Sequence, residues 1–575
     1  MYRKNDEHLQ KPMFSSLFDL PDKEKERLSR SWAGTFYEAC FCQIDEDIFS
    51  ILYSDKASRP NIAVNVLVSL EIMKSGFGWS DADLEEALHF NLQVRYALGY
   101  SSLDEGHFEL RTIYNFRQRL VHHMQQTGEN LLEEMFEQLT DEQIAKLHLK
   151  THKLRMDSTQ MGSNMRQMSR LQLLAEVLQR VWRMLDEHGQ AHYKEIFEAY
   201  VKGTSGQYVY HLKAGEGQSQ LKQIGQQMQH LLKYLASDYE DEPAYQVLKR
   251  VYGEHFIEDS SGLRAKDGAE LSATSLQSVD DWEASYRKKK GKGYQGYVTN
   301  VTETCEPDNN LQLIVKVQTE PNTTDDALML DDAVPNLVER MDVDEFHTDG
   351  GYNSPQVDET LQANGIEQFQ TAIRGNKSSD DRLSVSKFVF TRDEKGQPQQ
   401  ALCPQGQDVE VQPARKEGRF TALFDSEICQ TCPLFAKCPT QPLRRKPKRV
   451  LRVTQQQVNV AHRHANRRQA KASGRNLRSA VEATVRSLKH PFGNGKLPVR
   501  GKPRVGMMMI ASAAMTNLRR IWRYQMAGNA TQNSLTTAKN VLKQACDDIL
   551  NMFSTFFAMI STLFELPFFC QIANI

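Results

Sequence analysis

Three acidic residues, Asp157, Asp349 and Glu482, lie in sequence settings that favour metal-dependent chemistry on phosphodiesters. Mg²⁺ and Mn²⁺ prefer oxygen ligands, and two such ions about 4 Å apart stabilise the attacking and leaving oxygens of a phosphoryl transfer. Asp157 and Asp349 each end a predicted strand, and strand ends are where ligand sites of open α/β sheets assemble. An aspartate at a strand end is also a common turn former, so each aspartate alone has a structural interpretation too.

Glu482 is the best marked of the three acids, because it lies on a predicted helix in the most basic part of the chain. Between Arg444 and Arg504 the chain has eighteen Lys or Arg residues and this single acid. As a structural residue, Glu482 would pair with Arg478 and Arg486 one turn away, an effect of about 0.2–0.5 kcal/mol per pair. As a functional residue, it would bind metal among cations that hold DNA phosphates. A solvated basic face is the alternative for the segment.

Strands and helices that could position these acids follow one another in a mixed α/β order. The first predicted strand lies in His152–Gln160, a segment that ends in a polar turn. The other predicted strands are Gly293–Glu303, Leu311–Glu320, Asp344–Thr348 and Gly365–Ile373, and the predicted helices are Asp325–Met341, Ser354–Asn364 and Gly474–His490. A long amphipathic helical stretch, ending near Val251, separates the first strand from the second. With that stretch set aside, the order resembles the ribonuclease-H-like fold. The chain therefore reads as an α/β protein with an inserted helical segment.

The N-terminal part is predicted to be helical. Apolar spacing indicates two helices between Asn61 and Leu98, with Ser80 and Asp83 as a capping pair, and a third helix around Leu110–Val121. The third helix carries several polar residues, namely Arg111, Tyr114, Asn115, Arg117 and Arg119. This succession suits a helix-turn-helix-like unit whose third helix enters a DNA groove. An ordinary helical domain would show the same pattern.

Four of the nine cysteines cluster between the second aspartate and Glu482. Cys403, Cys429, Cys432 and Cys438 could supply four thiolates to a structural Zn²⁺, since one pair has the Cys-x2-Cys spacing. Free thiols are the alternative, and His462 or His464 could replace one ligand. So few cysteines in a long chain do not suit a disulfide framework, which favours a reducing compartment.

The whole chain has 575 residues and a formal net charge of −2, which suits several folded units rather than one core. Its N-terminus lacks the apolar run of a secretory signal, so we expect a cytoplasmic, nucleoid-associated protein. The apolar segment Ile549–Phe569 is nearly long enough to span a membrane, but polar residues interrupt it. We expect it to pack in a core or at an oligomer contact, with no membrane span.

Several of these motifs together resemble bacterial insertion-sequence transposases of the Asp-Asp-Glu (DDE) type, over about Arg59 to Trp522. The most specific pieces are MDST, HTDGGYNS and RNLRSAVEATVRSLKHPF, together with the N-terminal stretch that begins RPNIAVNVLVSLEIMKSGFGWS. The family's helix motif has Tyr, Arg, Glu and Lys at fixed spacing. Arg478, Glu482 and Lys489 match it, whereas Arg475 stands where the family usually has Tyr.

The resemblance implies a ribonuclease-H-like catalytic domain in which Asp157, Asp349 and Glu482 bind two Mg²⁺ ions, with Mn²⁺ as a substitute. It also implies that Arg478 and Lys489 position phosphates. With the basic pattern, this gives candidate DNA contacts at Arg111, Arg117, Arg475, Arg478, Arg486 and Lys489. The expected activity is cleavage and transfer of the strands at the element's terminal repeats, by a homo-oligomer on double-stranded DNA. A DNA-binding regulator without catalysis and a nuclease without strand transfer are the alternatives.

The expected domains follow from these elements. Residues 1–145 form the N-terminal helical domain and 146–525 the catalytic domain, with a helical insertion at about 163–285 and a Cys-rich insertion at about 376–460. Residues 526–575 form a hydrophobic helical tail.

Overall fold

The computed structural model describes residues 1–528 and 543, except 7, 9–19, 55, 57–58, 103, 214, 261, 290, 374–380, 394, 473 and 475. The apolar segment Ile549–Phe569 and Arg475 lie outside the described residues. Among the helices that are described, none is both long and apolar enough to cross a membrane.

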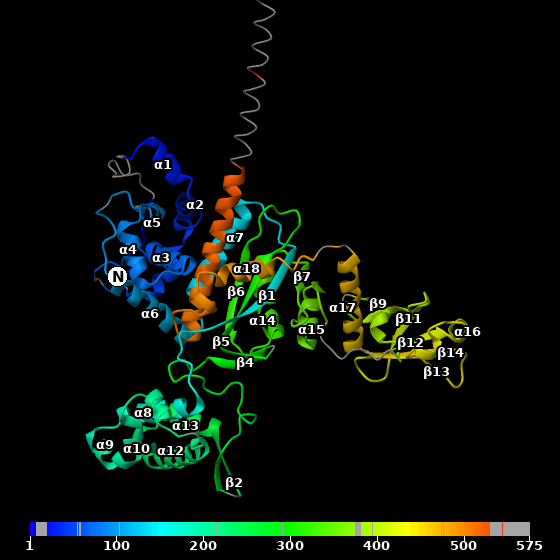
Figure 1. Ribbon diagram of the computed structural model, residues 1–575. Coiled ribbons are helices and arrows are strands. Elements are labelled where there is room, and N and C mark those ends of the chain that lie inside the picture. The colour runs from blue at the N-terminus through cyan, green and yellow to red at the C-terminus, as the bar shows by residue number, and fades with distance from the viewer. Residues whose placement is uncertain are drawn as a thin grey trace, which may run out of the picture.

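A six-stranded mixed sheet occupies the centre of the molecule (Figure 1). Its order is β4-β5-β1-β7-β8. Strand β4 pairs with the first half of β5, and β6 pairs with the second half. The strands are β1 (Lys153–Met161), β4 (Ser285–Lys289), β5 (Lys292–Thr304), β6 (Ile314–Pro321), β7 (Glu345–Thr348) and β8 (Glu367–Gln370). β1 is antiparallel to β5 and parallel to β7, and β7 is parallel to β8. This arrangement confirms the predicted mixed sheet of a ribonuclease-H-like core.

Helices cover both faces of this sheet. Neighbouring residues of β6 show the division, because Ile314 belongs to a core shared with the N-terminal helices, whereas Val315 belongs to a core with α14 and α15. The bounds of these helices are α14 (Asp326–Arg340) and α15 (Pro355–Ala363). The alternation follows from the strand period of two, which points successive side chains to opposite faces.

The N-terminal region is all helical, as its apolar spacing predicts. Its main helices are α1 (Asp22–Ser29), α2 (Trp32–Ala39), α3 (Val64–Phe77), α4 (Asp81–Phe90), α5 (Leu92–Ala97), α6 (Leu110–Thr127) and α7 (Leu131–Lys146). The predicted capping box at the start of α4 is present, with Ser80 and Asp83 bonded reciprocally. Helix α3 is buried on almost every side, because further helices surround it.

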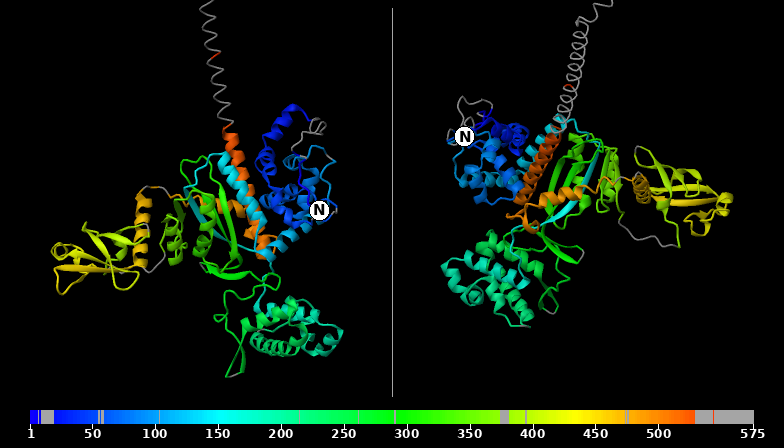
Figure 2. Two further views of the ribbon diagram at one scale, coloured as in Figure 1. Left: turned by 180° about the vertical axis from the view of Figure 1, so that it is seen from behind. Right: turned by 45° about the horizontal axis from the view of Figure 1, so that its top comes forward.

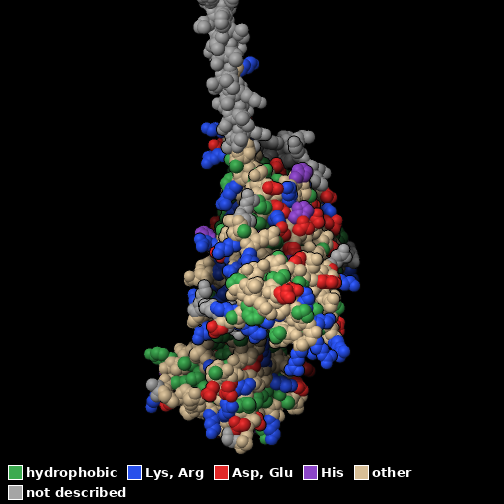
Figure 3. All heavy atoms as spheres, turned by 90° about the vertical axis from the view of Figure 1, so that its right-hand side faces the viewer, with side chains coloured by type: hydrophobic (Ala, Val, Ile, Leu, Met, Phe, Trp, Pro, Cys, Tyr) green, Lys and Arg blue, Asp and Glu red, His purple; other side chains and the backbone are tan. Residues whose placement is uncertain are grey.

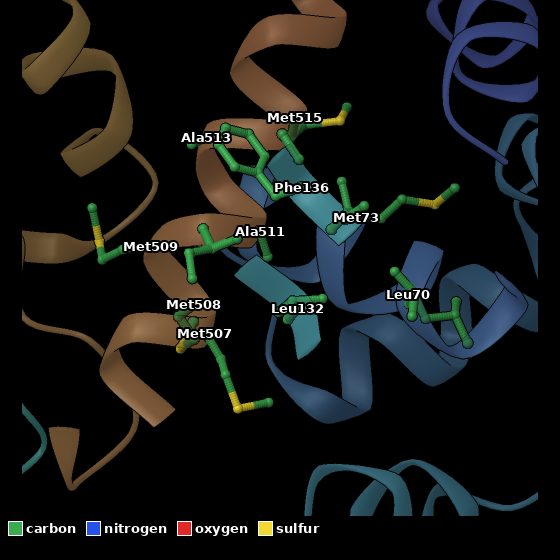
Figure 4. Close-up of a cluster of buried hydrophobic side chains, with 14 of the residues drawn as sticks. Leu70, Met73, Leu132, Phe136, Met507, Met508, Met509, Ala511, Ala513 and Met515 are labelled. Carbon is green, nitrogen blue, oxygen red and sulfur yellow. The ribbon is translucent and has the colours of Figure 1, made fainter. Parts of the chain in front are cut away.

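The C-terminal helix, 502–528 in the described part, packs between these N-terminal helices and the sheet (Figure 2). Figure 4 shows Met515 beside Phe136 of α7 and Met73 of α3. All three side chains are buried in one hydrophobic core that also includes residues of β5 and β6. The two ends of the described chain therefore fold as one body with the sheet.

Two insertions extend from the sheet at separate places (Figures 1 and 2). The first follows β1 and has its own hydrophobic core. Its elements are α8 (Arg170–Met184), α9 (Glu187–His192), α10 (Lys194–Val201), α11 (Ser205–Tyr210), α12 (Gly217–Tyr239), α13 (Pro243–His255), β2 (Phe256–Asp259) and β3 (Gly262–Ala265). It interrupts the chain between β1 and β4 without entering the sheet, as the predicted helical insertion requires.

The second insertion contains the four clustered cysteines and folds as a separate six-stranded sheet. Its elements are β9 (Val389–Arg392), β10 (Pro398–Leu402), β11 (Asp408–Pro413), β12 (Arg419–Asp425), α16 (Ser426–Gln430), β13 (Gln441–Pro442) and β14 (Lys448–Thr454), and α17 (Gln455–Ala472) leads back to the central sheet. Figure 3, viewed from this side, shows Lys and Arg side chains beside Asp and Glu. The face in that view is therefore not of a single charge.

Candidate active site

The register of two parallel strands brings Asp157 and Asp349 together. Arg155 of β1 lies opposite His347 of β7, and two further residues along each strand lead to Asp157 and Asp349. Asp349 follows the last residue of β7, as predicted, and one of its carboxylate oxygens accepts the Gly351 N–H at 2.6 Å. Asp157 is within β1 rather than at its end, because β1 continues to Met161 by pairing with β5. Only the pairing with β7 stops before Asp157.

Glu482 lies on α18 (Val481–Lys489), which packs against β1. The helix is shorter than the predicted span from Gly474, because residues 477–480 form a turn. Arg478, in that turn, donates to Asp157 Oδ2 at 2.8 Å and to Glu482 Oε1 at 3.3 Å. One guanidinium thus connects the acid on β1 with the acid on α18. The Glu482 side chain is 63% exposed, whereas that of Asp157 is 14% exposed.

The charges of these groups affect one another. Burial raises the pKa of Asp157 above its ordinary value, Arg478 opposes this rise, and the negative charge of Asp349 adds to it. Burial lowers the pKa of Arg478, but the charges of Asp157, Asp349 and Glu482 outweigh it and raise that pKa overall. All three acids therefore act on the same guanidinium, as expected for carboxylates that face a common region.

Three contacts hold α18 against the sheet. In the turn before it, Arg155 of β1 donates to the Leu477 carbonyl at 2.9 Å. In its middle, the Thr484 hydroxyl donates to Glu303 Oε2 at 2.8 Å. At its end, Lys489 Nζ donates to the Gln160 carbonyl at 2.9 Å. The helix is thus fixed along its length, and with it the position of Glu482.

Glu303 of β5 is central to this attachment and was not anticipated from the sequence. Its side chain is fully buried and also accepts from Arg155 at 2.7 Å and from Arg520 at 2.8 Å. A buried carboxylate requires such partners, because an unpaired charge in the interior is costly. One signal was present in the sequence, namely a single charged residue in the buried part of a strand that is otherwise uncharged there.

The predicted DNA contacts differ in their surroundings. Arg486 and Arg111 are exposed on α18 and α6. Lys489 is half-buried and bonded to β1, and burial lowers its pKa. Arg117 points inward and pairs with Glu71 at 2.6 Å and Asp81 at 2.8 Å, so it joins α6 to α3 and α4. Arg117 is therefore not included among the DNA contacts proposed below.

Within the described chain, no three His, Cys, Asp or Glu side chains converge closely enough to hold a metal ion. The statement applies both to the acidic cluster and to the cysteines. In the acidic cluster, Arg478 lies between the carboxylates and supplies the positive charge.

The four cysteines nevertheless share one end of the second insertion. Cys403, Cys429 and Cys438 pack against the same small core, and burial together with the neighbouring Cys438 and Cys403 raises the pKa of Cys429 above its ordinary value. Backbone N–H groups point at two of the sulfurs, from Gln407 to Cys403 at 3.3 Å and from Leu434 to Cys432 at 3.4 Å.

The two histidines named as substitute zinc ligands have other surroundings. His462 is bonded to Glu367 of β8 at 2.6 Å, which assigns it to the attachment of α17. His464 is half-buried beside Arg463, Arg467 and Arg468. Because His462 is bonded to Glu367 and His464 lies among arginines, neither is included among the zinc ligands proposed below.

Comparison with known proteins agrees with this geometry. The family model described as "Transposase DDE domain" matches residues 402–522, which include α17, α18 and Glu482. A second family model, described as "Transposase domain (DUF772)", matches residues 28–119 in the N-terminal helical region. No curated protein and no solved structure matches the chain. With the ribonuclease-H-like order of the sheet, the two matches support an insertion-sequence transposase of the Asp-Asp-Glu type.

Proposed function

We propose that this transposase cuts and rejoins DNA strands at the ends of its own element, with Asp157, Asp349 and Glu482 as the catalytic carboxylates. The observation that carries the proposal is the shared guanidinium of Arg478, which donates to acids on β1 and α18. Asp349 and Asp157 each lie two residues beyond the last pair of the β1–β7 register, and the charge of Asp349 acts on Asp157. These contacts support one site built from three separate elements, beside the end of β7, where ligand sites of open α/β sheets assemble.

The donor set fits Mg²⁺ or Mn²⁺, since all three candidate ligands are carboxylates and hard cations prefer oxygen. When bound, the ions would activate the attacking water or DNA 3′-hydroxyl and stabilise the leaving oxygen. Asp157 and Asp349 would bind the positively charged ions from β1 and from the end of β7, two paired strands. The role of Glu482 is to close the site from the exposed side, since its helix is fixed to the sheet by Glu303.

The cations around the site are suited to hold the DNA. Arg486 is exposed one turn beyond Glu482 on α18, where it is free to contact a phosphate. Arg478 would remain between the acids and the substrate and would position the phosphate by charge-assisted hydrogen bonds. We also propose that the transposase acts as a homo-oligomer, since two element ends must be brought together.

A second DNA contact is proposed at α6 in the N-terminal region. The exposed side of this helix carries side chains that donate or accept hydrogen bonds and no acid, namely Arg111, Tyr114, Asn115, Gln118, Arg119, His122, Gln125 and Gln126. Such a face suits the major groove, where Arg, Asn and Gln read base edges. Arg500 and Arg504 line a cavity with Asn115 and Arg119, so the basic surface continues onto the segment before the C-terminal helix.

For the second insertion we propose a structural Zn²⁺ bound by Cys403, Cys429, Cys432 and Cys438. The donor chemistry fits, since four thiols at the end of a small sheet match a closed zinc site. The N–H groups that point at Cys403 and Cys432 would stabilise thiolates. Zinc would hold the loop that contains Cys403 to the loop that contains α16 and would help this insertion to grip DNA.

The catalytic proposal is tested by Glu482→Gln, which keeps the size of the side chain and removes its charge. We expect the variant to bind terminal DNA within about twofold of the wild type and to lose Mg²⁺-dependent nicking. Glu359→Gln, an exposed glutamate on α15, is the matched control and should nick normally. Nicking by Glu482→Gln at the wild-type rate would refute the triad, and a strand-transfer assay of the wild type distinguishes a transposase from a nuclease.

A further inference from the structure

The loop that follows Asp349 is fixed to the sheet by contacts at both of its ends. At its start, the Asp349 carboxylate accepts the Gly351 N–H at 2.6 Å. Further along, the Gln368 side chain of β8 donates to the Tyr352 carbonyl at 2.7 Å. The backbone of the loop is therefore held by its own first residue and by the neighbouring strand.

Tyr352 extends from this loop into the core between the sheet and the helices α14 and α15. Its side chain is fully buried, in one hydrophobic core with Met156 of β1 and Val357 of α15. Its hydroxyl donates to Asn300 Oδ1 of β5 at 2.7 Å. The ring is thus packed on all sides, and its hydroxyl is bonded at a defined place on the sheet.

A row of polar side chains receives this hydroxyl. Ser158 of β1 lies opposite Asn300 of β5, which in turn lies opposite Gln318 of β6, so the three side chains share one face of the sheet. The Asn300 amide donates to Gln318 Oε1 at 2.8 Å, and the Gln318 amide donates to the Met329 carbonyl of α14 at 2.9 Å. The Tyr352 hydroxyl is also hydrogen-bonded to the Ser158 side chain. The row therefore ties the loop to β1 as well as to β5.

This polar row lies behind the candidate catalytic acids. Ser158 directly follows Asp157 in β1, so the two side chains point to opposite faces of the sheet. Burial and the negative charges of Asp326, Asp157 and Asp349 raise the pKa of Tyr352 well above its ordinary value. The hydroxyl therefore stays protonated as a hydrogen-bond donor, and both candidate metal ligands lie close enough to act on it.

We infer that Tyr352 is a positioning residue, which sets the place of Asp349 relative to Asp157 for metal binding. Asp349 lies beyond the last residue pair of β1 and β7, so the pairing of these two strands does not itself fix it. The Tyr352 hydroxyl supplies the missing connection from the loop to β1 and β5. Groups that orient metal ligands from behind affect metal affinity by about 10–100-fold. The inference rests on the proposed function, because it takes both aspartates as metal ligands.

Tyr352→Phe tests the inference, because it keeps the ring and removes only the hydroxyl. Mn²⁺ is the probe, and electron paramagnetic resonance of the free ion gives its affinity for the full-length protein without DNA. We expect the variant to bind Mn²⁺ about tenfold more weakly than the wild type. Its affinity for a duplex of arbitrary sequence should stay within about twofold. Wild-type affinity for Mn²⁺ in Tyr352→Phe would overturn the inference.

Tyr245→Phe is the matched control, in the helical insertion. Tyr245 is also a buried tyrosine, and its hydroxyl donates to the Leu232 carbonyl at 2.8 Å. Both variants should lower the thermal unfolding midpoint, since each loses a buried hydrogen bond. Only Tyr352→Phe should weaken Mn²⁺ binding. An equal loss of Mn²⁺ affinity in the two variants would show a general effect of stability and would contradict a positioning role.

Asn300→Leu tests whether the hydroxyl acts through its partner on β5. Removal of the acceptor should weaken Mn²⁺ binding by a similar factor. The double variant of Tyr352→Phe and Asn300→Leu should then bind Mn²⁺ within about twofold of the single variants, since both changes break one connection. Losses that multiply in the double variant would show that the two side chains act separately, and this result would contradict the inference.

Asp349→Asn distinguishes this inference from the catalytic proposal, because it removes a candidate ligand itself. The variant should lose Mn²⁺ binding at the site. If Asp349→Asn binds Mn²⁺ as the wild type does, the catalytic proposal and the positioning role are both wrong. If it loses the ion while Tyr352→Phe keeps wild-type affinity, only the positioning role is wrong.

Discussion

Arg478 and Asp157 form a largely buried ion pair, with Nη2 2.8 Å from Oδ2. The pair joins the turn before α18 to the middle of β1, two elements that are more than three hundred residues apart in the chain. The other terminal nitrogen of the Arg478 guanidinium, Nη1, donates to Glu482 Oε1 at 3.3 Å. The positions of Asp157 and Glu482 relative to each other therefore depend on one cation, which makes Arg478 the first residue to test.

Arg478→Ala should destabilise the protein when divalent metal is absent. The change leaves Asp157 buried beside Asp349 without its counter-charge, a loss of roughly 3 kcal/mol for a largely buried pair. Mg²⁺ should then raise the unfolding midpoint more in the variant than in the wild type, because the ion replaces the missing charge. Differential scanning calorimetry with and without Mg²⁺ measures both effects. Arg486→Ala, on the exposed side of α18, is the control, and an identical Mg²⁺ response in all three proteins would contradict this role.

Glu303→Gln should be the most destabilising single change at the site. Glu303 is fully buried between Arg155 and Arg520, so the variant leaves a buried and a partly buried cation without a carboxylate, at a cost of about 3–5 kcal/mol. Glu320→Gln is the comparison, since Glu320 pairs with Lys502 of the same C-terminal helix but is about one-third exposed. It should cost less than about 1 kcal/mol. Urea denaturation followed by circular dichroism gives both values, and equal losses would refute the role of Glu303.

Local patterns in the sequence predicted the helices and strands of the site better than the long-range contacts that these elements make. The strand before Asp349 and the basic helix around Glu482 were correctly anticipated from composition and spacing. The start of α18 was not, because the turn at 477–480 is held by a contact from Arg155, which is distant in sequence. Apolar spacing likewise left Arg117 on a polar flank of α6, while its partners Glu71 and Asp81 are in other helices.

The packing of the C-terminal helix was missed for the same physical reason. Apolar periodicity identifies a buried face but does not identify what covers it. Met515 of this helix belongs to the same hydrophobic core as residues of the N-terminal helices. Sequence spacing alone contains no information about that long-range contact.

The attachment of α17 to the sheet should depend on pH. Burial raises the pKa of Glu367, but hydrogen bonds from His462 and Asn466 and the charge of Arg392 outweigh it and lower the pKa to about 2. The unfolded value is about 4.3. The ionised group therefore contributes stability that is fully present above about pH 5 and is lost progressively as pH falls from there towards 2.

Glu367→Gln tests this prediction. The variant should be less stable than the wild type at pH 7 by about 1–2 kcal/mol, since the carboxylate is partly exposed and screened. The difference should shrink as pH is lowered from 5 to 3, because the wild-type carboxylate begins to lose its advantage there. Thermal unfolding of both proteins across this range measures it. A difference that stays constant down to pH 3 would show that charge at Glu367 is not involved.

The proposed zinc site predicts one Zn²⁺ per chain in the purified protein, measured by elemental analysis. Cys429→Ser should lose the metal and destabilise the sheet formed by β9–β14, because a structural zinc contributes folding free energy directly. Cys42→Ser, in the N-terminal region, is the control and should keep the metal. Zinc-free wild-type protein whose four cysteines all react with a thiol reagent would refute the site.

The close approach of α3 and the C-terminal helix is tested at Gly76. A Cβ atom on Gly76 would lie 2.2 Å from Cγ of Met515, closer than carbon atoms can approach, so Gly76→Ala requires the helices to move apart. We expect a loss of about 1–3 kcal/mol, the usual cost of overpacking a core. Gly253→Ala in α13 is the matched control, because nothing lies within 4 Å of its added Cβ. That change should stabilise the protein by about 0.5–1 kcal/mol through helix propensity. If both variants gained stability, Gly76 would not be at a tight contact, and the packing of the chain's two ends against each other would be wrong.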